Sequence, residues 1–347
     1  MAEYQGEPLS ACPKIVAAAI FVASMQGVGF SSLPFQVRLA AILLLGLAGF
    51  VIWDQLHWWR LRDDYSFGFL VPLFVAYVLH DRWPAIRGFF GQRWGPLRAG
   101  PTAPLRIVAG AVSYGLFAGG GGLLFLGALY RAAEGAAPAA SMPIALGFGL
   151  FVMATVYLLS DRNVHGERTP VDARARLALM FLFPAMIWLL SAPTFGVLET
   201  WISTYLLDKV AIFVYHSFEF SGFPIVREGS VLILPSGEVG VEDACSGIRS
   251  MTACLFAGSF LGAIFLDRLW KKASLVCAAM LLAFLTNLLR SLFLTVWAYR
   301  YGPEAIDGAI HDATGYGIVF LTVLGLFLLL PVFNFRLEVD DEDLAAS

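Results

Sequence analysis

Apolar residues occur along the chain in runs of about 20, separated by short polar links. An α-helix of this length crosses roughly 30 Å of hydrocarbon, so each run predicts a membrane span. The pattern predicts eight spans, near residues 37–53, 67–80, 105–130, 142–160, 177–195, 247–266, 273–299 and 309–334. A weaker run at 14–31, which includes Ser24 and Gln26, either crosses as a ninth span or lies along the interface.

Composition supports this pattern. Of the 347 residues, 59% are hydrophobic and only 14% are charged. A soluble domain of this length cannot bury so much apolar surface in one core. We therefore expect an all-α polytopic membrane protein that forms a single integral-membrane domain. Its expected parts are N-terminal helices (1–195), an external amphipathic helix and hairpin (196–244), catalytic helices (245–334) and a cytoplasmic tail (335–347).

The positions of Arg and Lys predict the orientation. Three links are rich in basic residues, 81–106, 161–176 and 267–272, and the positive-inside rule places them in the cytoplasm. The stretches 218–244 and 301–309 are acidic and are expected outside. The segment 54–66 is also expected outside, as an exception to the rule, because it contains Arg60 and Arg62.

The predicted external part has two kinds of element. Helical spacing in 195–218 places Thr200, Ser203, Thr204 and Asp208 toward one face, which favours an amphipathic helix over the alternative of a further span. Residues 222–243 alternate in strand fashion around a Pro-Ser-Gly turn at 235–237, a pattern typical of a β-hairpin. We expect this hairpin to cover the site and to pair with an extended substrate strand.

Cys245 directly precedes the span 247–266, at its predicted external end. The N-terminus of a helix has unpaired N–H groups and a partial positive charge, which favour the thiolate form of a cysteine. The other three cysteines, Cys12, Cys254 and Cys277, have apolar or small neighbours and are expected to be inert packing residues.

Two further polar side chains are predicted at the same depth as Cys245. Arg290 lies about 25 Å along the next span from its cytoplasmic end, in the outer hydrocarbon, with Asn287 one turn before it. An arginine there faces a partner or a water-filled cavity, unless it snorkels to the headgroups. His311 begins the last span on the same side.

Together these residues suit acyl transfer. A thiolate attacks a carbonyl, a histidine transfers the proton, and an arginine stabilises the thiolate or the oxyanion. Glu242 and Asp243 are candidates to orient His311 or bind substrate, although Asp243 is equally suited to cap the helix. The main alternative is a transporter or anion channel that uses Arg290 as a charge site, which leaves Cys245 without a role. No cofactor, metal ion or nucleic-acid partner is expected.

Three short blocks resemble the exosortase/archaeosortase family of integral-membrane cysteine enzymes. They are "ACSGIRS" (244–250), "NLLRS" (287–291) and "HDATGYG" (311–317). An upstream block, "DDYSFGFLVPLFVAYVL" (63–79), is similar to the family's early block, except that Phe67 stands where the family usually has a histidine. The resemblance implies that Cys245, Arg290 and His311 are the catalytic residues, and a histidine at the third position is typical of bacterial members.

The resemblance also implies a substrate and a place. Exosortases are taken to process exported surface proteins whose C-terminal signal is a Pro-Glu-Pro-type (PEP-CTERM) motif, one membrane span and a basic tail. The expected protein is thus a multi-pass cysteine peptidase or transpeptidase of the bacterial cytoplasmic (inner) membrane. Its active site would face the periplasm or exterior, with transfer to an acceptor or to water both open.

Overall fold

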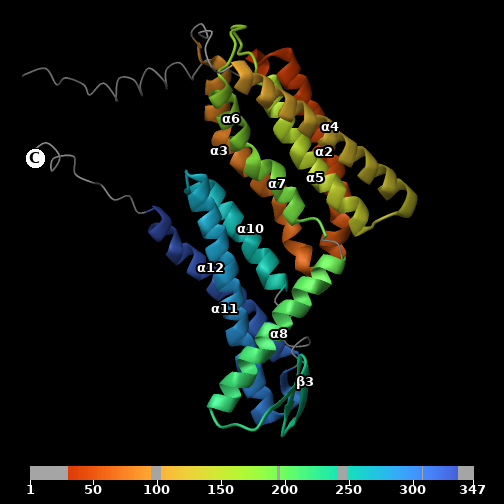
Figure 1. Ribbon diagram of the computed structural model, residues 1–347, viewed down its shortest axis with the longest axis vertical. Helices are drawn as coiled ribbons and strands as arrows, with labels where there is room; N and C mark the ends of the chain where they lie inside the picture. Colours follow the sequence, from red (N-terminus) through yellow and green to blue (C-terminus); the bar gives the residue numbers. More distant parts are fainter. Residues whose placement is uncertain (1–29, 95–102, 194–195, 241–247, 307, 335–347) are drawn as a thin grey trace, which may run out of the picture.

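The computed structural model describes residues 30–94, 103–193, 196–240, 248–306 and 308–334. This part of the chain is mostly helical and forms two groups of helices, joined along α10 (Figure 1). The N-terminal group comprises η1 (Phe30–Ser32), α2 (Phe35–Leu61), η2 (Asp63–Leu70), α3 (Val71–Gly91), α4 (Ala103–Glu134), α5 (Pro138–Leu159), α6 (Val171–Met180) and α7 (Leu182–Leu190). The C-terminal group comprises α8 (Gly196–Phe220), strands β1 (Val226–Glu228), β2 (Val231–Leu234) and β3 (Gly237–Gly240), then α10 (Ile248–Phe265), α11 (Leu269–Tyr301), η3 (Pro303–Ile306) and α12 (Ala309–Asn334).

Six helical segments of the described chain are long and apolar enough to cross a membrane. They are α2, α4, α5, the α6–α7 pair, α11 and α12. This confirms a helical membrane protein but not the predicted count of eight spans. The apolar part of α10, Met251–Phe265, is shorter than the rest, and α3 carries Asp81, Arg82 and Arg87 in its second half. Most of the candidate ninth span, residues 14–29, lies outside the described residues.

Small residues bring neighbouring helices close together. A Cβ atom on Gly120 of α4 would lie 2.7 Å from the backbone nitrogen of Phe151 in α5, and one on Gly147 would lie 2.7 Å from the Gly120 carbonyl oxygen. In the C-terminal group, a Cβ on Gly258 of α10 would lie 2.8 Å from the Ala279 Cβ of α11. Close backbone approach of this kind is how helices associate in lipid, where the hydrophobic effect does not drive them together.

The predicted span at 177–195 is interrupted, because α6 ends at Met180 and α7 begins at Leu182. Pro184 explains the break, since it has no N–H and its ring clashes with the carbonyl four residues earlier, that of Met180. The Arg82 side chain donates hydrogen bonds to this freed Met180 carbonyl and to the Ala263 carbonyl, the latter at 3.0 Å. One guanidinium thereby joins α3, α6 and α10.

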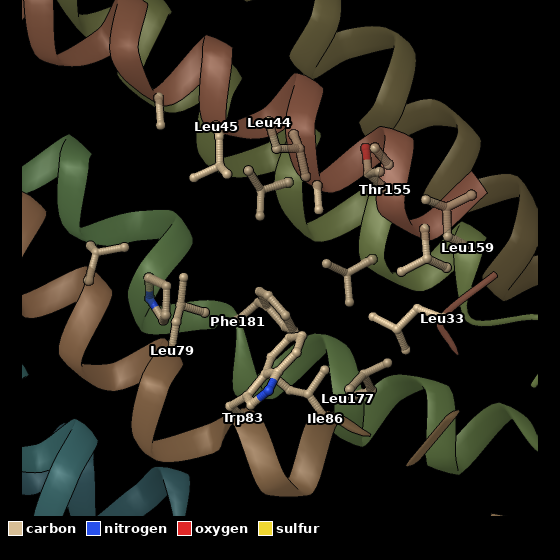
Figure 2. Close-up of a pocket in the computed structure, with 18 of the residues that line it drawn as sticks. Leu33, Leu44, Leu45, Leu79, Trp83, Ile86, Thr155, Leu159, Leu177 and Phe181 are labelled. Carbon is tan, nitrogen blue, oxygen red and sulfur yellow. The ribbon is translucent and has the colours of Figure 1, made fainter. Parts of the chain in front are cut away.

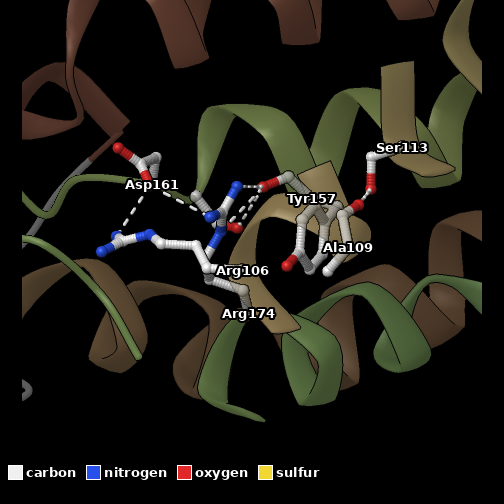
Figure 3. A network of polar contacts seen from close by, with 7 residues as sticks. Arg106, Ala109, Ser113, Tyr157, Asp161 and Arg174 are labelled. Atoms are coloured by element: carbon white, nitrogen blue, oxygen red, sulfur yellow. Dashed lines mark hydrogen bonds and ion pairs between the residues drawn. The ribbon is translucent and has the colours of Figure 1, made fainter. Parts of the chain in front are cut away.

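A second arginine organises the end of α5 (Figure 3). The Arg174 guanidinium donates to the Tyr157 carbonyl oxygen at 2.8 and 3.2 Å and to the Asp161 carboxylate at 3.0 Å. It also stacks on the Tyr157 ring at 4.1 Å, and Arg106 of α4 shares Asp161 at 3.2 Å. Two cations therefore share one carboxylate at the C-terminal end of a helix, where positive charge is favourable.

The segment that was predicted to be external has more strands than the sequence predicted. Instead of a two-stranded hairpin, β1, β2 and β3 form an antiparallel sheet in that order. The predicted turn at 235–237 joins β2 to β3, and Gly229 and Gly237 have positive φ angles of 64° and 137°, which favour glycine. Helix α8 packs an apolar stripe, which includes Leu207, Ala211 and Val214, against this sheet and α11. It is not among the candidate spans.

The two ends of the molecule differ as the charge pattern predicts. Two of the basic links contact each other, because the Val164 amide of 161–176 donates to the Phe90 carbonyl of 81–106 at 3.1 Å. Arg82 reaches Ala263 near the end of α10, which leads into the third basic link. The sheet and the α11–α12 turn lie at the opposite end, below the helices in Figure 1. Opposite placement of the basic and acidic links agrees with the predicted orientation.

Candidate active site

Arg290 lies on α11 against the first turns of α12. Its Nη2 donates to the backbone carbonyl of His311 at 3.2 Å, and its Nε lies 3.4 Å from the Thr314 hydroxyl oxygen. A Cβ on Gly315 would be 3.7 Å from Nη2, so the guanidinium lies over a backbone that has no side chain at this point. The structure therefore brings together two of the three predicted catalytic residues, from consecutive helices.

The charge of Arg290 is not neutralised within the described residues. Both of its hydrogen-bond partners are uncharged, and no carboxylate of the described chain lies within ion-pair distance of it. Asp312, in the first turn of α12, is exposed to solvent. The guanidinium also lies at a helix N-terminus, which carries partial positive charge. Two positive features at one place favour the binding of an anion, such as a thiolate, an oxyanion or a carboxylate.

His311 and Asn287 differ in their access to this site. His311 is half-buried at the start of α12, with its backbone held by Arg290 and Thr314. Asn287, one turn below Arg290, is 5% exposed, and its carbonyl accepts a hydrogen bond from the Ser291 hydroxyl at 3.0 Å. Asn287 is therefore buried, and the His311 side chain is more exposed than that of Asn287.

Cys245, Glu242 and Asp243 lie outside the described residues. The structure describes the chain up to Gly240 and again from Ile248, where α10 begins, as the sequence predicts for a helix that follows Cys245. The grouping of Cys245 with Arg290 and His311 therefore stays a prediction. Cys12 also lies outside, whereas Cys254 is buried and Cys277 is exposed on α11, both with free thiols.

The upstream block at 63–79 packs against α10. The Thr252 hydroxyl donates to the Asp64 carbonyl at 3.2 Å, across 188 positions of sequence. The ring of Phe67, at the position where the family usually has histidine, lies 5.0 Å from that of Phe256. Gly68 allows this arrangement, because a Cβ there would collide with the Trp59 indole of α2. The block therefore forms the support on which the helix after Cys245 is placed.

The sheet caps the turn between α11 and α12. The Ser236 hydroxyl donates to the Ala298 carbonyl at 3.0 Å, near the C-terminal end of α11. A Cβ on Gly237 would lie 2.8 Å from the Pro303 ring, so this glycine permits close contact with η3. The sheet therefore packs on the turn that leads from α11 to the start of α12, and its role as a cover over the site stays a prediction.

An apolar groove opens beside this region, between α8, α10 and α11. It has a volume of about 530 Å³ and is lined by side chains such as Phe213, Met251 and Leu288. Lys209 also lines it and pairs with Asp208 at 3.3 Å. The groove lies beside Met251, near the start of α10.

Two supporting residues were not singled out from the sequence. Thr314 follows His311 by three residues in the block at 311–317, so helical spacing was a usable signal that it shares a face with the histidine. Thr252 had no such signal, because its partner lies in a different part of the sequence. Within the described residues, no group of three His, Cys, Asp or Glu side chains is arranged to hold a metal ion.

Comparison with known proteins identifies the family. Residues 58–329, more than three quarters of the chain, match the family described as Transmembrane exosortase. Searches of curated proteins and of solved structures found no match. The matched range contains the upstream block, the position of Cys245, Arg290 and His311. The chain therefore belongs to the transmembrane exosortase family of membrane-embedded, protein-sorting proteases or transpeptidases.

Proposed function

We propose that this exosortase is a cysteine transpeptidase or protease that cleaves C-terminal sorting signals of the PEP-CTERM type. The cleavage takes place at the outer face of the cytoplasmic membrane, in exported surface proteins. The observation that carries the proposal is the Arg290 guanidinium, held by uncharged partners at the N-terminus of α12. A cation placed in this way suits an active site that must stabilise negative charge during the reaction.

The proposed reaction has two steps. The Cys245 thiolate attacks the carbonyl carbon of the scissile peptide, and Arg290 stabilises the resulting oxyanion. Collapse of this intermediate breaks the C–N bond, with a proton from His311 going to the leaving amine, and leaves a thioester on Cys245. An acceptor amine or water then gives a proton to His311 and attacks the thioester carbonyl, and the C–S bond breaks to release the Cys245 thiolate.

The arrangement of the chain supports an external site. Arg290 and His311 lie toward the end that carries the sheet, and the basic links lie at the other end, which the positive-inside rule assigns to the cytoplasm. The apolar groove beside α10 gives an approach for the apolar segment that follows the sorting motif. The transporter hypothesis has no comparable support, because the family match is to a sorting enzyme.

The test is processing of a reporter protein that ends in a Pro-Glu-Pro motif, an apolar span and a basic tail. Cells producing the intact chain should convert the reporter to a shorter product, and Cys245→Ala should leave it full-length while inserting normally. Cys277→Ala is the matched control, because that thiol is exposed on α11 and should not affect processing. Normal processing by Cys245→Ala would refute the proposal.

Orientation is tested separately by thiol labelling in a chain whose own cysteines have been replaced. Glu304→Cys, on the exposed α11–α12 turn, should react with a membrane-impermeant reagent added from outside. Lys271→Cys, in the basic link, should react only after the membrane is opened. The reverse pattern would contradict an external site.

A further inference from the structure

Buried threonines differ between the two groups of helices. Thr155 of α5 lines an apolar cavity in the N-terminal group, and its hydroxyl has no hydrogen-bond partner among the described residues (Figure 2). In the C-terminal group, Thr286 of α11 and Thr322 of α12 are 8% and 0% exposed, and their hydroxyl oxygens lie 3.0 Å apart. This contact is a hydrogen bond between the two helices that carry Arg290 and His311, and the proposed reaction does not use it.

Each of these two hydroxyls also contacts its own helix. The Thr286 hydroxyl lies 2.9 Å from the Leu282 carbonyl oxygen and 3.1 Å from that of Ala283. The Thr322 hydroxyl lies 2.8 Å from the Ile318 carbonyl oxygen. A hydroxyl has one hydrogen to donate and two lone pairs that accept. One threonine therefore donates to the other, which donates to a carbonyl of its own helix, so each helix is placed against the backbone of its neighbour.

The helices are closely packed around this pair of threonines. A Cβ on Gly325 of α12 would lie 2.5 Å from a methyl carbon of Leu282 in α11. On the side of α10, the buried Cys254 thiol is within hydrogen-bond reach of the Thr322 hydroxyl. Small residues and polar side chains hold helices together in lipid, where the hydrophobic effect does not. The Thr286–Thr322 pair therefore lies where α10, α11 and α12 meet.

The pair lies close to Arg290 along α11 but far from His311 along α12. Arg290 follows Thr286 by four residues, so it lies about 6 Å further along the same face of α11. His311 precedes Thr322 by 11 residues, about 16 Å along α12. A tilt of α12 by about 5° at the pair therefore moves the His311 carbonyl by about 1.4 Å. A displacement of this size is enough to break the 3.2 Å hydrogen bond from Arg290 Nη2 to that carbonyl.

We infer that the Thr286–Thr322 hydrogen bond positions the Arg290 guanidinium for the reaction, because it sets the place of α12 against α11. The inference rests on the proposed function, in which Arg290 stabilises the oxyanion. Both threonines are buried between helices, so they are positioning residues that act through Arg290 and do not touch substrate. A displacement of about 1 Å at a reacting centre can cost about 100-fold in rate. We expect about a tenfold loss when this bond alone is removed, because the packing of Gly325 on Leu282 remains.

The first test measures processing of the Pro-Glu-Pro reporter by the full-length protein purified in detergent. Thr286→Val replaces the hydroxyl with a methyl group of similar size and should lower kcat about tenfold per folded enzyme, with KM nearly unchanged. The thermal midpoint should change little, because hydrogen bonds between membrane helices contribute little to stability on average. Thr286→Ser retains the hydroxyl and should restore kcat.

Thr295→Val is the matched control for this test. Thr295 lies on the same helix and is 2% exposed, and its hydroxyl donates to the Ser291 carbonyl of α11 itself. Its replacement should therefore leave kcat unchanged. Equal kcat values for Thr286→Val and Thr295→Val would overturn the inference.

A double variant shows whether the threonines act through Arg290. In an Arg290→Ala background, Thr286→Val should lower kcat no further, because the effects of residues that act through one another do not add. A general effect on the helices would lower the rate in both backgrounds. A further tenfold loss in the double variant would therefore contradict the inference.

Spin labels measure the placement of α12 without the reaction. Labels at the exposed positions Arg300 and Tyr316, at the end of α11 and near the start of α12, are attached in a chain whose other accessible cysteines have been replaced. The distribution of distances between the labels should broaden in Thr286→Val and not in Thr295→Val. Failure of the intact chain to process the reporter would contradict the proposed function, and with it the catalytic role of the pair. An unchanged distance distribution in Thr286→Val would contradict the inference alone.

Discussion

Arg174 in the N-terminal group and Arg290 in the C-terminal group are both arginines within membrane helices, yet their surroundings differ. Arg174 is 5% exposed and has an acidic partner, Asp161, in addition to two hydrogen bonds to the Tyr157 carbonyl and a stacked ring. Arg290 is half-buried, and its partners among the described residues are a hydroxyl and a carbonyl. The Arg174 guanidinium is neutralised and bonded within the fold. The Arg290 guanidinium has no acidic partner among the described residues and can bind a further anionic group.

Other buried polar groups of the N-terminal group are also paired. In the N-terminal group, the fully buried Asp54 is paired with Arg131 at 2.7 Å, and the Gln55 amide is bonded to Ser191 and to the Trp188 carbonyl. Burial of charge in lipid requires such pairing, so these contacts indicate structural roles. An intramembrane arginine without an acidic partner is therefore the more informative sign of function.

The largest effect is expected at Arg290. Arg290→Ala should lower the processing rate of a signal-bearing reporter by about 100- to 1,000-fold, the usual loss when one oxyanion donor is removed. The thermal midpoint should change little, because the two hydrogen bonds that the side chain makes to described residues are both to uncharged groups. Arg290→Lys should retain the fold but lose most processing, since lysine has the charge without the planar fork of donors. Normal processing by Arg290→Ala would show that Arg290 has no catalytic role.

Arg174→Ala should have the opposite profile. Loss of its charged hydrogen bonds should lower the free energy of unfolding by about 2–3 kcal/mol, because the Tyr157 carbonyl and Asp161 each lose a charged donor and retain only the Ser160 hydroxyl and Arg106, respectively. Chemical denaturation in detergent measures this change. Once corrected for the amount of folded protein, the processing rate should be unaltered. A specific loss of processing with unchanged stability would mean that Arg174 is not structural.

Gly68→Ala tests the junction between the two groups. The new methyl collides with the Trp59 indole, so η2 must move, and with it the support that Asp64 and Phe67 give to α10. Overpacking of this kind costs about 1–3 kcal/mol, and processing should fall as well. Gly122→Ala is the control, because a Cβ there meets no atom within 4 Å and alanine favours a helix. Equal stability and equal processing rates for Gly68→Ala and Gly122→Ala would show that η2 does not position α10.

The smallest effect is expected in the link between α5 and α6. The Trp94 backbone N–H bonds the Glu167 carboxylate at 2.7 Å and, with the Asn163 amide, lowers the pKa of that group below its ordinary value of 4.5. Since the pKa is lower in the folded state, the stabilisation is complete above about pH 4.5 and disappears as the pH falls through the folded value. Thermal midpoints of the intact chain should therefore fall over this range, and those of Glu167→Gln should fall less. If the thermal midpoints of the intact chain and of Glu167→Gln change with pH in the same way, Glu167 does not contribute to this stabilisation.

Much of the architecture follows from local sequence. Backbone groups in lipid must be bonded within the segment, so long apolar runs become helices whatever surrounds them. The alternating residues around the turn at 235–237 predicted β2 and β3 correctly. The positions of Arg290 and His311 at one end also follow, because helical rise and the order of spans determine depth.

Other features depend on contacts between distant parts of the chain. The break at Phe181 follows from Pro184, but its stabilisation depends on Arg82, 98 residues away from Met180. Thr252 meets Asp64 across 188 positions, and β1 is joined to α8 by the ion pair between Arg227 and Asp208 at 2.7 Å. Most of all, a sequence shows that a charge is present but not whether it is neutralised. Only the packing of helices decided that Arg174 has a carboxylate beside it and that Arg290, among the described residues, has none.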